Sequence, residues 1–274
     1  DKIIAGKQAF LNLPFFFIRA IAYITVWIWA AYMLRKYSLQ QDLNGGLIYH
    51  KKSISVSVAF IVFFAVTICT SSWDWILSID AHWFSTLFGW YVFSGLWVSG
   101  AIVTIIFILY LKSKGYLQQV NKSHIHDIGK WMFAISMVWS YLWLSQFLLI
   151  WYANIPEEVM YYQYRIEHYK ILYFGMVLVN FFFPFFVLMS SDAKKNTGYL
   201  LTVAIIIFFG HWIDVFVMIM PGTVGEHWHI GFIEIGTFMG FLGLFLFVVQ
   251  RSLTKAPLEV QHHPYLEESV HLHY

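Results

Sequence analysis

Seven stretches of mostly apolar residues follow one another along the chain, separated by short segments rich in polar and charged residues. Each stretch is about 20 residues long, the length that an α-helix needs to cross the hydrocarbon core of a bilayer. The pattern therefore predicts seven transmembrane helices, at residues 14–34, 54–72, 84–111, 131–151, 169–190, 198–220 and 230–249, followed by a polar C-terminal tail at 251–274.

The composition points to the same class of protein and excludes others. Hydrophobic residues make up 59% of the chain and charged residues 12%, whereas soluble domains carry about a quarter charged residues. We therefore expect an all-α integral membrane protein. The net charge of +2 is too small for a nucleic-acid-binding surface. The single cysteine, Cys69, lies in an apolar stretch and leaves no disulfide framework and no thiolate metal site.

Two features should interrupt the helices. Pro184 lies inside the fifth predicted helix, where its missing N–H and its ring favour a bend. The segment from Trp73 to Thr86 is too polar to continue the second helix and too aromatic to leave the membrane interface. It predicts an elbow on the outer side, with Asp80 and His82 as its polar residues.

Basic residues are distributed unequally between the two faces. The loops after the first, third and fifth helices and the tail carry twelve: Arg35, Lys36, Lys51, Lys52, Lys112, Lys114, Lys122, Lys130, Lys194, Lys195, Arg251 and Lys255. The opposite face carries Lys2, Lys7, Arg165 and Lys170, and Arg19 lies within the first helix. The positive-inside rule therefore predicts a cytoplasmic tail. Asp1 would then lie outside, and we expect an odd number of further helices upstream of it.

Three ionisable residues lie within the outer halves of the last two helices. His211 and Asp214 are three residues apart and share a helical face, and Glu234 lies at a matching depth in the next helix. Ionisable groups are costly in hydrocarbon unless they pair or line a wet cavity. The trio predicts a proton relay that opens outward, and Asp74, Asp80 and His82 are further relay candidates. The alternative is a structural network of mutually bonded polar groups.

Other polar residues within the helices are weaker candidates for binding. Gln146 and Tyr141 in the fourth helix and Asn180 in the fifth could contact a quinone headgroup or bridge neighbouring helices. Histidines in the 226–229 segment and in the tail have no cysteine partners, and we predict no metal site there.

Several membrane functions do not fit the sequence. A retinal protein needs a lysine in a late helix, and residues 230–249 contain none. A haem b subunit needs axial histidines on two helices, but His211 is the sole histidine well inside a predicted helix. A secondary transporter usually shows two related halves, and no convincing internal repeat is present. Transport stays open as an alternative.

Four segments, in chain order, resemble one family. They are the run Ser72 to Thr86 leading into Gly89-Trp90-Tyr91, the stretch from Ser145-Gln146-Phe147 through Trp151 to Glu158, the segment Asp214 to Pro221, and the tail segment His263 to Ser269. Together they resemble the second of the two polysulfide-reductase-type (NrfD-like) membrane subunits of bacterial alternative complex III.

This resemblance implies a ten-helix subunit with two four-helix bundles in the bacterial inner membrane. The complex would oxidise quinol, such as menaquinone, and pass electrons to cytochrome c or a terminal oxidase. The resemblance implies no covalently bound cofactor in this chain, with haem c and iron–sulfur centres in partner subunits, beside a second NrfD-like subunit and lipid. The chain would contribute a proton path and quinone contacts; the alternative is a non-catalytic membrane scaffold of such a complex.

Overall fold

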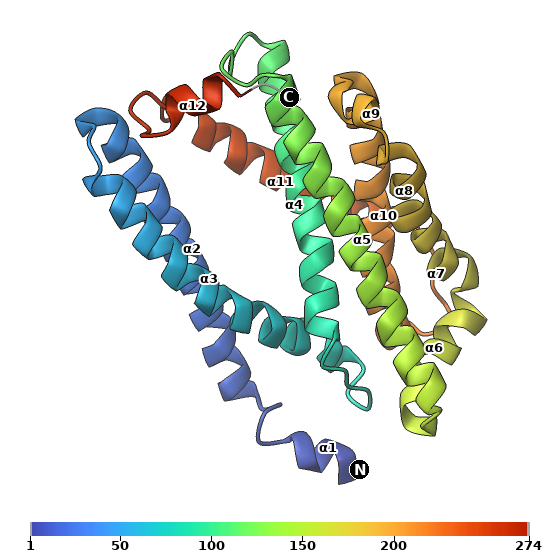
Figure 1. Ribbon diagram of the computed structural model, residues 1–274. Coiled ribbons are helices and arrows are strands. Elements are labelled where there is room, and N and C mark those ends of the chain that lie inside the picture. The colour runs from blue at the N-terminus through green and yellow to red at the C-terminus, as the bar shows by residue number, and fades with distance from the viewer. Residues whose placement is uncertain (1, 273–274) are drawn as a thin grey trace.

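The structure, a computed structural model that describes residues 2–272, confirms the seven predicted membrane-spanning helices. The helices with their bounds are α1 (Lys2–Lys7), α2 (Leu13–Asn44), α3 (Ile48–Trp75), η1 (Leu77–Ile79), α4 (Phe88–Ser113), α5 (Lys122–Ala153), α6 (Pro156–His168), α7 (Lys170–Val177), η2 (Leu178–Phe182), α8 (Phe183–Leu188), α9 (Ser191–Lys195), α10 (Thr197–Thr223), α11 (Phe232–Leu253) and α12 (Leu266–Val270). No strand occurs within residues 2–272. Figure 1 shows the two ends of the chain at opposite ends of the molecule, as an odd number of spans requires.

Four spans form the central bundle. Helices α4, α5 and α10 pack with the fifth span, which runs through α7, η2 and α8 (Figure 1). The hairpin of α2 and α3 joins this bundle through α3 and α4. Helix α11 lies at the periphery and buries none of its residues. The central bundle therefore provides most of the buried environment in which polar groups can be held.

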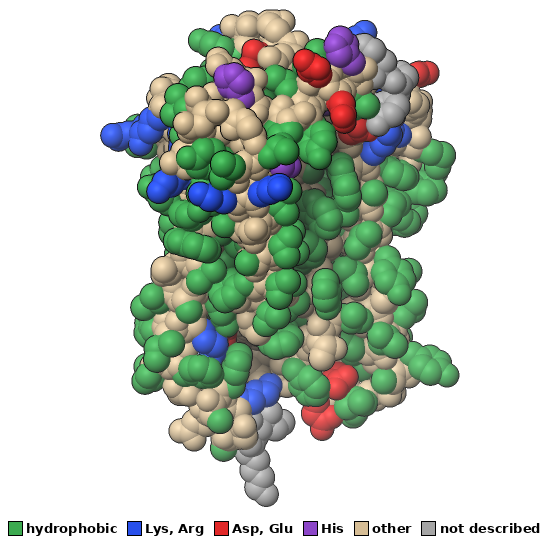
Figure 2. Space-filling view, turned by 60° about the vertical axis from the view of Figure 1, so that its left-hand side comes forward, with side chains coloured by type: hydrophobic (Ala, Val, Ile, Leu, Met, Phe, Trp, Pro, Cys, Tyr) green, Lys and Arg blue, Asp and Glu red, His purple; other side chains and the backbone are tan. Residues whose placement is uncertain are grey.

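The spans are surrounded by hydrophobic side chains. Figure 2 shows these side chains over the middle of the visible face, with most charged side chains towards its two ends. Exposed residues on α2, α3 and α11 include Ile21, Ile61 and Phe241. A helix that exposes such residues along its length is stable in lipid, where the chain must satisfy its backbone hydrogen bonds internally.

Several helices extend beyond the predicted spans on the side of the tail. Helix α2 continues ten residues past Leu34, to Asn44, and α5 begins at Lys122 rather than near Trp131. Asn121 caps α5 by accepting hydrogen bonds from the backbone N–H groups of Ser123 and His124. The predicted bounds came from the apolar part of each helix, so they leave out polar helical turns that extend beyond the membrane.

The fifth span is interrupted immediately before Pro184. Residues Leu178–Phe182 form one π-helical turn, and the α-helix resumes at Phe183. Such turns commonly accommodate a proline within a membrane helix. Asn180 projects from this turn against Gly210 of α10, where a Cβ atom would lie 2.0 Å from the Asn180 side-chain oxygen. Glycine at position 210 is therefore required for this close approach of the two helices.

The predicted elbow is present but begins later than expected. Helix α3 continues through Trp73 and Asp74 to Trp75, and the chain turns through η1 before α4 starts at Phe88. Lys7 holds the elbow by donating to the carbonyl oxygen of Ala81 at 2.6 Å. The predicted start of the elbow at Trp73 is therefore wrong. Asp74 belongs to helix α3, where it forms a buried ion pair with Arg19.

The tail packs across the end of the molecule that carries the α2–α3 and α4–α5 turns. The Gln41 amide donates to the carbonyl oxygen of His262 at 3.0 Å, and Asp42 accepts from the backbone N–H of Gln261 at 3.0 Å. At the other turn, the backbone N–H of Gln118 donates to Glu259 at 2.7 Å. The tail thus links the hairpin to the central bundle; residues 273–274 lie outside the described part.

Candidate functional site

The buried carboxylate of Asp214 is the centre of the candidate site. Tyr91 of α4 donates its hydroxyl to Oδ1, and the indole Nε1 of Trp139 on α5 donates to Oδ2 at 3.0 Å. Asp214 is 2% exposed, so these bonds replace the water that an ionised carboxylate would otherwise hold. Three helices of the central bundle therefore converge on one carboxylate.

His211 lies beside this carboxylate, one helical turn away. Its Nδ1 atom is 3.8 Å from Asp214 Oδ2, too far for a hydrogen bond but close enough for the carboxylate to attract the imidazole once the ring gains a proton. The rings of Trp139 and His211 pack nearly perpendicular to each other, with centroids 5.4 Å apart. Both His211 nitrogens are buried and have no hydrogen-bond partner among the described residues. The imidazole is therefore free to bond a ligand.

A cavity of about 440 Å³ lies against this pair, between α3, α4 and α10. Its walls are mostly aromatic and aliphatic, with His211, Asp214 and the hydroxyls of Ser71, Ser72 and Ser99 as polar groups. Trp27 and Trp75 line the side of the hairpin, and Trp212 and Phe238 line the side of α11. A mostly apolar cavity of this size with a few convergent polar groups is typical of a site for a small organic molecule.

A second, smaller space lies on the other side of Asp214. We call it the tyrosine chamber; its walls are Tyr91, Trp143, Gln146, Tyr161, Tyr162, Arg165, Tyr173, Met176, Asp214, Val217 and Met218, and its volume is about 20 Å³. Asp214 lines both the large cavity and the chamber. The carboxylate therefore separates an apolar site from a polar one.

Arg165 is the buried cation of the chamber. It is 2% exposed and donates to the carbonyl oxygens of Val217 and Met218, each at 3.2 Å. Pro221 lacks the N–H that would have bonded to Val217, so Arg165 satisfies a carbonyl that the proline leaves free. The guanidinium also lies 3.3 Å from the Tyr161 ring centroid. Among the described residues it forms no ion pair with a carboxylate.

Two tyrosines of α6 line the chamber in protonated form at neutral pH. Burial raises the pKa of Tyr161, the nearby Arg165 charge opposes this shift, and the charges of Asp80 and Asp214 add to it. Burial also raises the pKa of Tyr162, and a hydrogen bond from Gln146 acts in the opposite direction. Both phenols therefore keep their protons and can donate hydrogen bonds.

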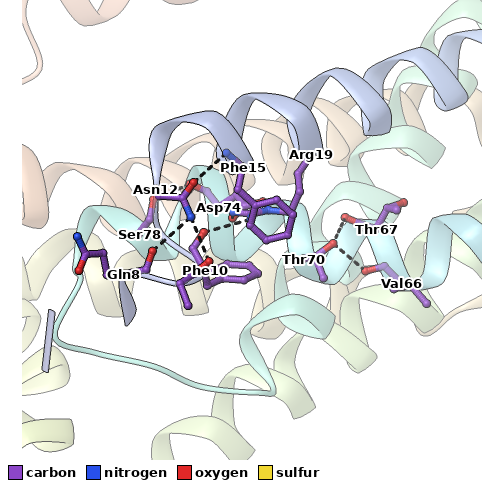
Figure 3. Close-up of polar contacts among 11 residues, drawn as sticks. Gln8, Phe10, Asn12, Phe15, Arg19, Val66, Thr67, Thr70, Asp74 and Ser78 are labelled. Atoms are coloured by element: carbon purple, nitrogen blue, oxygen red, sulfur yellow. Dashed lines mark hydrogen bonds and ion pairs between the residues drawn. The ribbon is translucent and has the colours of Figure 1, made fainter. Parts of the chain in front are cut away.

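Asp74 has a different role from the predicted one, because it forms a buried ion pair with Arg19 (Figure 3). Arg19 Nε donates to Oδ2 at 2.8 Å and Nη2 donates to Oδ1 at 2.6 Å, which is a bidentate pair. The guanidinium carbon lies 3.9 and 4.1 Å from the ring centroids of Phe10 and Phe15. The pair links α2 to α3. Because the Arg19 guanidinium already neutralises the Asp74 carboxylate, Asp74 is a poor proton carrier.

Glu234 does not join His211 and Asp214, so the predicted three-residue cluster is wrong. Its carboxylate accepts a hydrogen bond from the backbone N–H of Gly231 at 2.9 Å and caps the first turn of α11. No hydrogen bond or ion pair connects it to the other two among the residues described. Glu234 is partly exposed at this end of α11, so its carboxylate stays near water.

The three predicted quinone contacts do not share a site. Gln146 lines the tyrosine chamber, whereas Tyr141 is 68% exposed on the outside of α5. Asn180 is fully buried at the π-turn beside Gly210. Of the three, Gln146 alone lines one of the two spaces beside Asp214.

The remaining relay candidates lie in the elbow. Asp80 is partly exposed and close enough to influence Tyr161 electrostatically, and His82 is exposed. Asp80 is therefore a partly exposed carboxylate near the Tyr161 wall of the chamber.

Sequence reasoning missed Tyr91, Trp139, Tyr161, Tyr173 and Arg165. Charge counting placed Arg165 on the outer surface, and no local pattern distinguishes these tyrosines from interfacial ones. Tyr91 was present in the Gly89-Trp90-Tyr91 segment, but nothing in that segment indicates Asp214 as its partner. Neither a known protein family nor a curated protein matches this sequence.

Proposed function

We propose that this chain is a membrane subunit of a quinol-oxidising complex, in which His211 and Asp214 receive protons from a quinol bound in the large cavity. One observation carries the proposal: a buried carboxylate and an unpartnered imidazole stand together at the wall of an apolar cavity of about 440 Å³. An aromatic diol has two polar groups on an apolar ring, and such a cavity suits it.

The reaction divides protons and electrons between partners. Quinol releases two protons and two electrons as it becomes quinone. The Asp214 carboxylate and the His211 imidazole each accept one proton. The electrons pass to one-electron acceptors of the haem or iron–sulfur class in partner subunits, as the family resemblance implies. Tyr91 and Trp139 orient the carboxylate by donating to its two oxygens.

The surroundings of the cavity provide a place for a long hydrophobic tail such as that of menaquinone. An apolar groove of about 940 Å³ runs between α4, α10 and α11. It shares Phe208, Trp212, Val215 and Phe238 with the cavity. Phe238 of α11 lines both spaces, so a displacement of its side chain would connect the groove to the cavity.

Photolabelling tests the site. A menaquinone analogue with a photoreactive ring, added to the complex in lipid nanodiscs, should label α3, α4 and α10 at residues that line the cavity, such as Ser72 and Val92. Excess unmodified menaquinone should prevent this labelling. Labelling restricted to lipid-facing residues such as Ile21 or Ile61, or labelling unaffected by the competitor, would contradict a specific site.

We also propose that the tail faces the cytoplasm and the elbow faces the periplasm of a bacterial inner membrane. The twelve basic residues against four support this orientation. A single cysteine at Gln261, in a chain with Cys69→Ser, should react with a membrane-impermeant maleimide in inverted vesicles only. A cysteine at exposed Glu157 should react in intact spheroplasts only, and the reverse pattern would refute the orientation.

A scaffold role is the second candidate. It is favoured by α11, which buries none of its residues and exposes apolar side chains that would suit helices of partner subunits. A pure scaffold predicts that neutralising Asp214 lowers the amount of assembled complex but leaves the turnover of each assembled complex unchanged.

A further inference from the structure

The tyrosine chamber contains polar atoms that no protein group satisfies. The side-chain oxygen of Gln146 and the hydroxyl of Tyr173 are buried and have no hydrogen-bond partner among the described residues. Both residues line the chamber, and their exposed fractions are 5% and 2%. Leaving such atoms without a partner is unfavourable, because each has lost the hydrogen bonds that it made with water. Two unsatisfied atoms in one small space indicate a bound polar molecule.

The size and chemistry of the chamber identify that molecule. Its volume of about 20 Å³ exceeds the roughly 10–15 Å³ that one water requires, and it is too small for a larger ligand. A buried water needs two to four polar partners. Gln146 offers an acceptor, Tyr173 a hydroxyl that donates or accepts, and Arg165 and Asp214 a positive and a negative group.

We propose that the tyrosine chamber binds a single ordered water that connects Asp214 with Arg165 and serves as the first proton acceptor beyond Asp214. The guanidinium and the carboxylate then form an ion pair separated by water. This arrangement explains why buried Arg165 has no carboxylate in direct contact among the described residues. It also provides a partner for the Gln146 oxygen and the Tyr173 hydroxyl.

The bound water also sets the direction of proton transfer away from the cavity. This part of the inference rests on the proposed function. A quinol in the large cavity protonates Asp214 from one side. The carboxyl group then loses this proton to the chamber water, which simultaneously releases another proton towards Tyr161, so that the water and the ionised carboxylate are both regenerated. Tyr161 passes the proton on by accepting at its hydroxyl oxygen while donating its own proton towards Asp80 in the elbow. Arg165 opposes storage of the proton on the water by its fixed positive charge.

X-ray radiolytic labelling of the complex in lipid nanodiscs, in ¹⁸O-labelled water, tests for the bound water. Hydroxyl radicals formed at an internal water modify the side chains beside it. We expect modification of Tyr162 and Tyr173 despite their burial. Phe88 is equally buried and does not line the chamber, so it should stay unmodified. Tyr162 and Tyr173 as unreactive as Phe88 would overturn the water site.

Two variants sharpen the test. Gln146→Leu removes a partner of the water at similar volume and should reduce modification of Tyr173 to the level of Phe88. Tyr173→Phe removes only a hydroxyl, so its packing is retained, and it should reduce modification of Tyr162. Ser136→Ala also removes a buried, unpartnered hydroxyl, but one outside the chamber, and should leave both labels unchanged. Labels that persist in Gln146→Leu and in Tyr173→Phe would overturn the assignment.

These measurements need no quinol, so they distinguish this inference from the proposed function. If the chamber is labelled but menaquinone does not bind in the cavity, the water site holds and the quinol site fails. If menaquinone binds and Gln146→Leu loses the water while retaining wild-type turnover and proton release, the proton route through the chamber is refuted.

Discussion

Replacing Asp214 by asparagine is expected to slow quinol oxidation about 10²–10⁴-fold, the usual contribution of a positioned general base. Asparagine keeps the size of the side chain: its oxygen can accept the hydrogen bond from Trp139, and its NH2 group can donate to the Tyr91 hydroxyl oxygen. It cannot accept a proton from quinol at neutral pH. The amount of assembled complex should therefore change little, and turnover per assembled complex, measured by cytochrome c reduction with menaquinol, should decrease.

The matched control for this variant is Asp192→Asn, an identical change at an exposed residue of α9 that lines neither the cavity nor the chamber. It should retain wild-type turnover. An Asp214→Asn complex that turns over like wild type, with unchanged proton release, would show that the Tyr91–Asp214–Trp139 network has a structural role only.

Breaking the ion pair between α2 and α3 is expected to have the largest effect on stability. Arg19→Met leaves the Asp74 carboxylate buried without its bidentate partner, and removal of one partner from such a pair costs about 3–5 kcal/mol. It also removes the cation that lies between the rings of Phe10 and Phe15. The free energy of unfolding, measured by steric trapping in lipid bicelles, should decrease by that amount.

The double variant Arg19→Met with Asp74→Leu should recover most of this loss, because no buried charge is then left unpaired. Arg35→Met is the matched single control. Arg35 lies exposed on the same helix and donates only to the backbone oxygen of Ser252, so its replacement should change the free energy by about 0.5 kcal/mol or less. If Arg19→Met and Arg35→Met are equally stable, the buried pair does not hold the hairpin together.

The sequence by itself determined the number of spans and their approximate positions. A bilayer requires about 20 apolar residues for each helix and requires every backbone group to be bonded within it, so this information is local. Pro184 likewise marked the interrupted helix, because the missing N–H acts on its own turn. The neighbourhood of His211 and Asp214 was also readable, since residues three apart share a helical face.

Glu234 shows where a local feature was overlooked. Glycine at 231 followed by glutamate three residues later is a capping arrangement, which uses the carboxylate at the helix end and removes it from the bundle. Matched depth alone could not place it beside Asp214, because depth says nothing about the direction in which a side chain points.

Only the tertiary structure decided which groups meet. Arg19 and Asp74 are 55 residues apart, and Tyr91 and Asp214 are 123 apart. Charge counting assigned Arg165 to the surface, whereas packing of α6 against the end of α10 buries it beside the Val217 carbonyl that Pro221 leaves free. The rotation of each helix about its axis depends on close-packed side chains from all its neighbours at once, such as Gly210 against Asn180. The rotation of each helix determines the partners of its buried polar groups. It cannot be deduced from any single segment of the sequence.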